Sequence, residues 1–468
     1  MFLIEKNKLI KSFFMGIVLA IYVFVMLSMI GGSNQKLVLE ISTISAFIIL
    51  IIEIIQIKKI TGKVFCPVIL FLISYYVFQN GQLLLIALHI DFNSFYINTL
   101  KQYMSDVSIF SAISTVLAGY AAFIMCKNKK GNKKIYKIDQ MNPALVQKTA
   151  QLGFLVCSLV AIPLVIYKAS IGIAGGYSAV RFVEGNIPSI INFIEYMFMP
   201  FATILMIYSD KKNTKKIAII VLLWAIITSL CGDRTTGIGA IVLLLYLFSL
   251  KEENGLIQKN KLISFLLMLF IGWVIIVFIQ VAYAVRTQSA FTYNSIFDVV
   301  IQTVADLGFS CFPLFTMMNI VPSYEGFLYG SGYVLSFIGG LIPSFIDFTG
   351  IIRKINSMSR VFENWQSIYY SQYSFGFGFS LNAEAYINFG WYGLIILFML
   401  LIFIFKMLSD NTMNENGSYW GKYKSCILLF LWFTLPRRDS YYIWKAIFYS
   451  IIVMYVYLRA FSKVVKRK

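Results

Sequence analysis

The sequence predicts an all-α protein that crosses a membrane about twelve times. Hydrophobic residues make up 59% of the 468 residues and charged residues only 13%, whereas a soluble protein of this size carries about 25% charged residues. Apolar runs of about twenty residues recur along the whole chain, and each is long enough to cross a hydrocarbon core of ~30 Å. Lysines gather in every second connection, as is typical of cytoplasmic loops.

Twelve apolar segments define the predicted spans. They cover residues 12–30, 37–57, 64–88, 106–126, 150–167, 189–208, 217–231, 235–250, 262–284, 383–405, 425–436 and 441–458. The first segment follows three lysines and resembles a signal sequence. It has no small-residue cleavage site and many spans follow it, so we expect it to be retained as a span.

The basic residues predict that both termini lie in the cytoplasm. With the N-terminus inside, 28 of the 40 basic residues fall in cytoplasmic segments, and the opposite orientation leaves only twelve there. Because an excess of basic residues marks the cytoplasmic loops, the first orientation is predicted. The same rule accounts for the net charge of +19, so no nucleic-acid partner is expected.

The spans divide the chain into three regions. Residues 1–284 hold nine predicted transmembrane helices, 285–382 form a long extracytoplasmic loop, and 383–468 hold three more transmembrane helices. Within the loop, 295–320 reads as an apolar helix with a narrow polar stripe, and 326–348 is apolar but rich in glycine. We interpret these two as interfacial or re-entrant helices; the alternative is two further spans.

Arginine and lysine are distributed differently. Seven of the nine arginines are expected on the outer face, whereas only five of the 31 lysines are expected there. A guanidinium binds phosphate or carboxylate through a rigid donor fork, which an ammonium lacks. We interpret the outward arginines as ligands of an anion; the alternative is that they anchor lipid headgroups or pair with acids. They are Arg181, Arg234, Arg286, Arg353, Arg360, Arg437 and Arg438.

An aromatic segment follows in the long loop. Eight of the twenty residues 361–380 are aromatic: Phe362, Trp365, Tyr369, Tyr370, Tyr373, Phe375, Phe377 and Phe379. One interpretation is an aromatic belt at the membrane surface. The other is a platform for sugar rings, because flat aromatic faces suit apolar sugar faces while Tyr and Trp keep a polar group. On the second interpretation, Trp365 and Tyr370 bind substrate.

The most informative string is SFGFGFSLNAEAYINFGWYG, residues 374–393. Glu384 and Asn388 lie four residues apart, on one face of a helix at the outer entrance to the predicted span 383–405. An ionisable residue at this depth is a functional candidate. The alternative is a glutamate that is satisfied by an arginine or by a helix N-terminus.

Common catalytic motifs of other classes are missing from the sequence. There is no P-loop, dinucleotide fingerprint, HExxH motif or Gly-x-Ser-x-Gly elbow. The one histidine, His89, lies at the outer end of a predicted span, and the six cysteines are far apart. We expect no metal and no cofactor.

At Arg234 and Glu384 the sequence resembles the bacterial O-antigen and capsular polysaccharide repeat-unit polymerases of the Wzy type. The likeness includes many spans, a long outer loop late in the chain, and a Gly-x-Arg step that opens a short span at Gly232. The string AEAYINFGWYG is similar to the family's Glu-x-Tyr-x-Asn-Phe-Gly pattern. An Arg-x10-Gly pattern of some members does not follow Arg181, Arg286, Arg353 or Arg360.

The resemblance implies a membrane glycosyltransferase on the outer face of the bacterial cytoplasmic membrane. Its substrates would be polyprenyl-diphosphate-linked oligosaccharides, which are joined into surface polysaccharide with release of the lipid carrier. Its partners would be the lipid bilayer, a flippase and a chain-length regulator protein. Cations would neutralise the leaving diphosphate. Glu384 is the best-placed general base, ahead of Asp306, Glu325 and Glu363.

Two other functions fit parts of the same pattern. A lipid-linked oligosaccharide flippase would also need cationic residues and many spans, but such transporters tend to have repeated halves, and none is visible here. An O-antigen ligase of the related type depends on a histidine in the long outer loop. Residues 285–382 contain none, which favours the polymerase.

Overall fold

The fold is helical throughout the described part of the chain. The computed structural model describes residues 2–32, 34–92, 102–127, 136–251, 295–347, 349–372, 377–414 and 418–465, together with 277, 280, 281 and 284. These residues contain helices and no strand, which confirms the predicted all-α class.

The helices fall into long and short ones. The long ones are α1 (Phe2–Ser28), α2 (Gln35–Thr61), α3 (Pro67–Ala87), α4 (Met104–Lys127), α5 (Pro143–Asn186), α6 (Ser189–Tyr208), α7 (Lys211–Leu230), α8 (Arg234–Lys251) and α17 (Gly393–Asn414). The shorter ones are α11 (Ile296–Gly308), α12 (Phe312–Ile320), α13 (Ser331–Leu341), α14 (Ile351–Ser359), α15 (Val361–Tyr369), α16 (Leu381–Phe389), α18 (Tyr419–Trp432), α19 (Tyr441–Lys445), the π-helical η6 (Ala446–Val453) and α20 (Met454–Val465). Short 3-10 turns, η2 to η5, lie between some of them.

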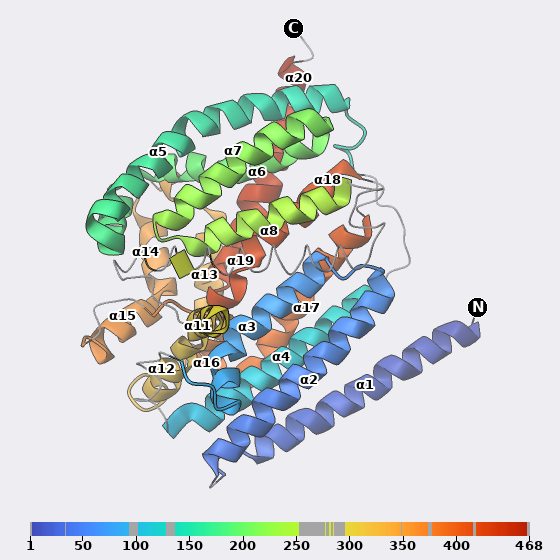
Figure 1. Cartoon of the computed structure of the whole chain (residues 1–468), viewed down its shortest axis with the longest axis vertical. Coiled ribbons are helices and arrows are strands. Elements are labelled where there is room, and N and C mark those ends of the chain that lie inside the picture. The colour runs from blue at the N-terminus through green and yellow to red at the C-terminus, as the bar shows by residue number, and fades with distance from the viewer. Residues whose placement is uncertain are drawn as a thin grey trace.

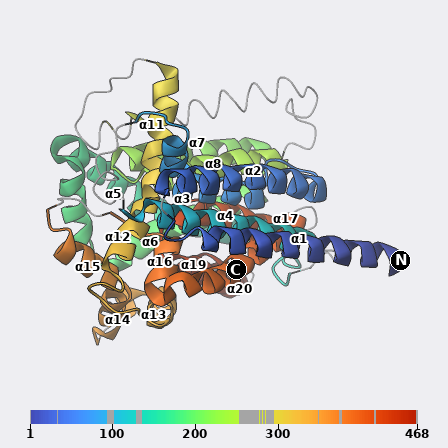
Figure 2. The same cartoon turned by 90° about the horizontal axis from the view of Figure 1, so that it is seen from below.

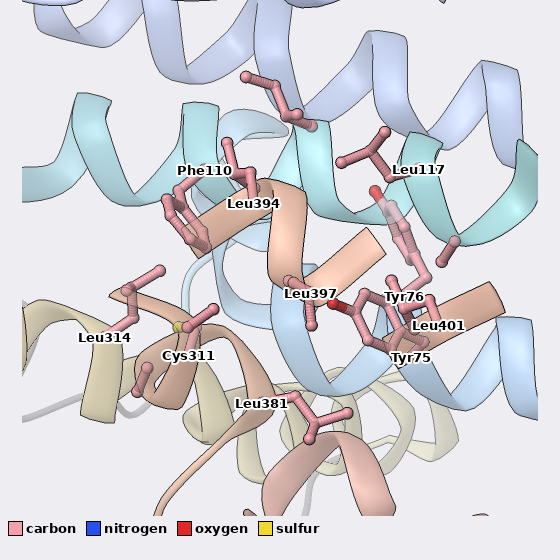
Figure 3. Close-up of a cluster of buried hydrophobic side chains, with 14 of the residues drawn as sticks. Tyr75, Tyr76, Phe110, Leu117, Cys311, Leu314, Leu381, Leu394, Leu397 and Leu401 are labelled. Atoms are coloured by element: carbon pink, nitrogen blue, oxygen red, sulfur yellow. The ribbon is translucent and has the colours of Figure 1, made fainter. Parts of the chain in front are cut away.

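Two packed bundles make up the molecule. In Figure 1, α2, α3, α4 and α17 form one group, and α5, α6, α7, α8 and α18 form the other. Each group has its own buried apolar core. Figure 3 shows the first core, in which Tyr75 of α3, Phe110 of α4 and Leu397 of α17 lie together. α18 contacts α3 and α8 and so joins the two bundles.

Local sequence signals explain several helix ends. Pro143 opens α5, where its missing N–H costs nothing, and the side chain of Asn142 accepts a hydrogen bond from Ala144 N. The side chain of Ser380 caps α16 by accepting from Ala383 N. Gly176 interrupts α5 with φ +70°, a backbone conformation that glycine adopts without strain.

Nine helices in the described residues are long and apolar enough to cross a membrane. They are Gln35–Thr61, Pro67–Ala87, Met104–Lys127, Pro143–Gly176, Ser189–Tyr208, Lys211–Leu230, Phe297–Ile320, Leu381–Asp410 and Tyr441–Phe461. The described part of α1, together with α8 and α13, supplies shorter apolar helices. The predicted span 262–284 lies almost wholly outside the described residues, so the count of twelve stays a prediction.

The predicted loop 285–382 contains one of these nine helices. Phe297–Ile320 runs through α11, η2 and α12 and has the length of a span. It packs along α3, where Gly81 and Gly308 bring the two backbones close together. This part of the loop therefore fits the alternative of a further span, and the three-region division stays a prediction. The remaining helices α13, α14 and α15 are too short to cross.

Two of the short helices, α14 and α15, lie at one end of the bundles. Figures 1 and 2 both place α14 and α15 at the end opposite the N-terminus. We name this the loop end.

The predicted orientation puts the loop end outside the cell. We expect a cysteine introduced at Ser367, exposed on α15, to react with a membrane-impermeant maleimide in intact cells. A cysteine at Lys212, exposed in the first turn of α7, should react only after the membrane is opened. The six native cysteines are buried, which keeps the background low. Labelling of both positions from the same side would contradict this orientation.

Candidate functional site

Glu384 is buried and both of its oxygens are occupied. Its side chain is 3% exposed. Oε2 accepts a hydrogen bond from Ser440 N at 2.7 Å, and Oε1 accepts one from the Ser440 hydroxyl at 2.7 Å. The hydroxyl of Ser336, on α13, lies 3.5 Å from Oε1. The side chain of Glu384, on α16, is thus hydrogen-bonded to Ser440, the residue that precedes α19.

This geometry gives Glu384 a structural task. The first N–H groups of a helix lack partners within it and attract negative charge. Ser440 is the N-cap of α19, and α19 continues through η6 into α20. Glu384 therefore holds the last helical segment against α16, as the alternative interpretation of the sequence proposed. Its assignment as the general base stays a prediction.

Asp439 lies beside this contact. It is 3% exposed, and its Oδ1 has no hydrogen-bond partner among the described residues. Burial raises the pKa of Asp439 to about 6, although the positive charges of Arg360 and Arg438 oppose that rise. Unsatisfied buried acceptors are uncommon in folded proteins, and Asp439 is one of several such side chains among the described residues.

Two of the predicted arginines come from different elements and lie close enough to Asp439 for their positive charges to act on it. The guanidinium of Arg438 lies 4.4 Å from the ring centre of Tyr442, and its Nη2 lies 3.5 Å from the Thr235 hydroxyl. Arg360 comes from the junction of α14 and α15 and pairs with Glu363, with 3.3 Å between Nε and Oε1. Arg360 and Arg438 thus lie near the same carboxyl group, and their assignment to an anionic ligand stays a prediction.

Lys445 supplies a third cation. Its Nζ lies 5.2 Å from the ring centre of Tyr196 and 5.8 Å from those of Tyr441 and Tyr449. Among the described residues no carboxylate pairs with it, so the aromatic faces provide its attraction. The π-helical segment η6 starts at the next residue, and such segments are frequent at functional sites. We name Glu384, Asp439, Arg360, Arg438 and Lys445 the charged cluster.

Arg234 lies near the cluster but has its own acid. Its Nη1 is 3.7 Å from Asp306 Oδ2, and both side chains are nearly buried. The preceding Asp233 accepts hydrogen bonds from the hydroxyls of Thr235 and Thr236. Burial opposes ionisation of Asp233, but Arg438 and these hydrogen bonds outweigh it and lower its pKa. Removal of one partner of a buried pair such as Arg234–Asp306 costs about 3–5 kcal/mol, which favours a structural interpretation, and the assignment of Arg234 to substrate binding stays a prediction.

The other four predicted arginines do not belong to the charged cluster. Arg181 is exposed and pairs with Glu184 at 3.0 Å. Arg353 is exposed on α14. Arg437 precedes Arg438 in the turn η5 (Leu435–Arg437) and is partly buried. Arg286 lies outside the described residues. The set is thus not one site in the described structure.

The remaining candidates are internal. The side-chain amide of Asn388 donates to the backbone oxygen of Glu384 at 2.8 Å and packs beside Gly332. Trp365 and Tyr370 are buried in the apolar core of the first bundle, and the Tyr370 hydroxyl accepts a hydrogen bond from Asn319. In this structure their rings are covered by other side chains. Their assignment to sugar binding stays a prediction, and binding would require this packing to open.

Asp439, Ser440 and Lys445 were not among the site residues predicted from the sequence. A signal was present: Arg437-Arg438-Asp439 fills an outer turn, and Lys445 follows one helical turn inside the last span. Charged residues within a span are costly and often functional. Among the described residues, no group of three or more His, Cys, Asp or Glu side chains is placed to hold a metal ion.

Comparison with known proteins gives one match. A family model described as O-antigen polysaccharide polymerase Wzy matches residues 12–468, nearly the whole chain. No curated protein and no solved structure matches the chain. The matched region contains both bundles and the entire charged cluster.

Proposed function

Because the chain belongs to the O-antigen polysaccharide polymerase Wzy family, we propose that it joins polyprenyl-diphosphate-linked oligosaccharide repeat units into a surface polysaccharide. Transfer would take place on the outer face of the bacterial cytoplasmic membrane. The charged cluster at the loop end would be the site of transfer. The observation that carries the proposal is that the positive charges of Arg360 and Arg438 act on the buried Asp439, beside the buried Glu384, and that Lys445 lies at the end of the helix that follows.

The cations suit a diphosphate leaving group. Negative charge develops on the diphosphate as the sugar leaves it, and preorganised positive groups in a dry site stabilise such charge strongly. Arg360 and Arg438 offer forked donors, and Lys445 offers a compact charge. The described contacts leave Lys445 without an acid, so it could accept an anionic ligand without breaking an ion pair.

The two buried carboxyl groups are suited to activate the hydroxyl group of the acceptor sugar. A sugar hydroxyl becomes a stronger nucleophile when a carboxylate within hydrogen-bond reach takes its proton. Glu384 and Asp439 lie next to each other among these cations. One site would thus hold both a base for the incoming hydroxyl and positive charge for the departing diphosphate. A flippase would act before this step, and a chain-length regulator would act together with the polymerase.

A genetic experiment separates polymerase from flippase. The gene is deleted in its host, and the surface polysaccharide is sized by electrophoresis with and without a plasmid copy. We expect the deletion strain to display single repeat units and the plasmid to restore long chains. Loss of all displayed units, with lipid-linked units trapped inside the cell, would contradict the proposal and indicate a flippase.

A further inference from the structure

The two carboxyl groups of the charged cluster differ in what they can still bind. Both oxygens of Glu384 are engaged by Ser440 at 2.7 Å. A base must present a free lone pair to the proton that it takes. An ionised carboxylate has about four lone-pair sites, and the backbone N–H and hydroxyl of Ser440 and the hydroxyl of Ser336 already engage up to three of them. The position of Glu384 therefore favours a supporting role.

Asp439 has the opposite geometry. Its Oδ1 is buried and has no hydrogen-bond partner among the described residues. A buried acceptor without a donor is destabilising, and a bound hydroxyl group would supply the missing donor. The nearest charges are Arg360 and Arg438, which attract the carboxylate, and Glu363 and Glu384, which repel it.

We infer that Asp439 accepts the proton of the acceptor hydroxyl, and that Glu384 is a positioning residue that fixes Asp439 through the neighbouring Ser440. This inference rests on the proposed function and deepens it. Asp439 and Ser440 are consecutive, so the two hydrogen bonds to Ser440 also fix the backbone from which the Asp439 side chain projects.

The step balances without a further reactant. The acceptor hydroxyl oxygen forms a bond to the anomeric carbon of the donor sugar, and its proton passes to Asp439. The bond between that carbon and the diphosphate oxygen breaks, and its electron pair stays on the diphosphate. The products are a lengthened oligosaccharide and the free lipid diphosphate, whose charge Arg438 and Lys445 stabilise.

The titration of Asp439 predicts a pH profile. Its pKa of about 6 means that acidification through pH 6 protonates the base, so the rate falls below that pH. Burial is the main cause of the raised pKa, and the negative charge of Glu363 adds to it. Glu363→Gln removes that charge, so the acid limb of the profile should move to lower pH.

The test compares purified Asp439→Asn, Glu384→Gln and Glu363→Gln proteins with the unmutated protein, using lipid-linked repeat units as substrate. Asp439→Asn should lower the rate about 10²–10⁴-fold. Glu384→Gln should keep most of the activity, because an amide can accept from Ser440 N and donate to its hydroxyl. Glu384→Ala removes both hydrogen bonds to Ser440 and should lose activity. Activity in Glu384→Gln but not in Glu384→Ala would show that the hydrogen bonds, and not the charge, are required.

The outcomes distinguish the inference from the proposed function. If the unmutated protein forms no polymer, the proposed function fails. If that protein is active but Asp439→Asn stays active, or Glu384→Gln is inactive while correctly folded, Asp439 is not the base and the inference fails. If Asp439→Asn does not fold, the pH–rate profile of Glu363→Gln tests the inference instead. An acid limb at the same pH as in the unmutated protein would overturn the inference, and an acid limb at lower pH would support it.

Discussion

Replacement of Arg438 by alanine is expected to lower the rate of polymer formation about 10²–10³-fold, the usual cost of losing one preorganised charge-stabilising group. The positive charge of Arg438 acts on Asp439, and its guanidinium lies on the ring of Tyr442 and approaches the hydroxyl of Thr235. Its guanidinium is therefore held in place before substrate arrives. The measurement is the initial rate with purified protein and lipid-linked repeat units.

The lysine variant separates charge from shape. Arg438→Lys keeps the positive charge but loses the flat donor fork and the contact with the Tyr442 ring. We expect it to remain at least about 10-fold slower than the unmutated protein. Lys354→Ala is the matched control, because it removes an exposed basic residue of the loop end and should leave the rate unchanged. Full activity of Arg438→Lys would show that a generic positive field is sufficient.

Replacement of Lys445 by methionine is expected to have an effect of similar size, about 10²-fold. Methionine keeps the length of the side chain and its packing among Tyr196, Tyr441 and Tyr449 but removes the charge. Lys445→Arg keeps the charge and the contacts with aromatic rings, so it should recover part of the rate.

Thermal unfolding in detergent is the control for Lys445→Met. The ammonium has no acid partner among the described residues, so its removal strands no buried carboxylate. We expect a melting temperature within a few degrees of that of the unmutated protein. An active Lys445→Met protein would remove Lys445 from the site and leave Arg360 and Arg438 to bind the diphosphate.

The helical fold was largely predictable from the sequence. Length and hydropathy locate helices that cross a bilayer, because unpaired backbone groups are excluded from lipid. The predicted spans 37–57 and 189–208 fall within α2 and α6. The loop 285–382 was harder, because the polar stripe of 295–320 fits both an interfacial helix and a span that packs on α3. The length of Phe297–Ile320 and the packing of Gly81 against Gly308 favour the second.

The site was predictable only in part. Arg360, Arg438 and Glu384 were predicted as site residues from residue type and position alone. Arginines on the outer face and an acidic residue in a predicted span both indicate function. Their meeting depends on contacts between segments more than fifty residues apart, such as Glu384 with Ser440, and one sequence does not show such pairs. Trp365 and Tyr370 were selected for their chemistry, although the fold uses both as core residues. Burial is a property of the packed structure and not of a local pattern.

The central claim is tested most directly by reconstituting the purified protein in liposomes with lipid-linked repeat units and no other protein. The products are sized by electrophoresis, and the released polyprenyl diphosphate is measured in parallel. We expect a ladder of lengthened chains, with one carrier diphosphate released for each bond formed and both signals lost in the Arg438→Ala protein. Movement of intact lipid-linked units across the bilayer, with no lengthening and no release of carrier, would contradict the account.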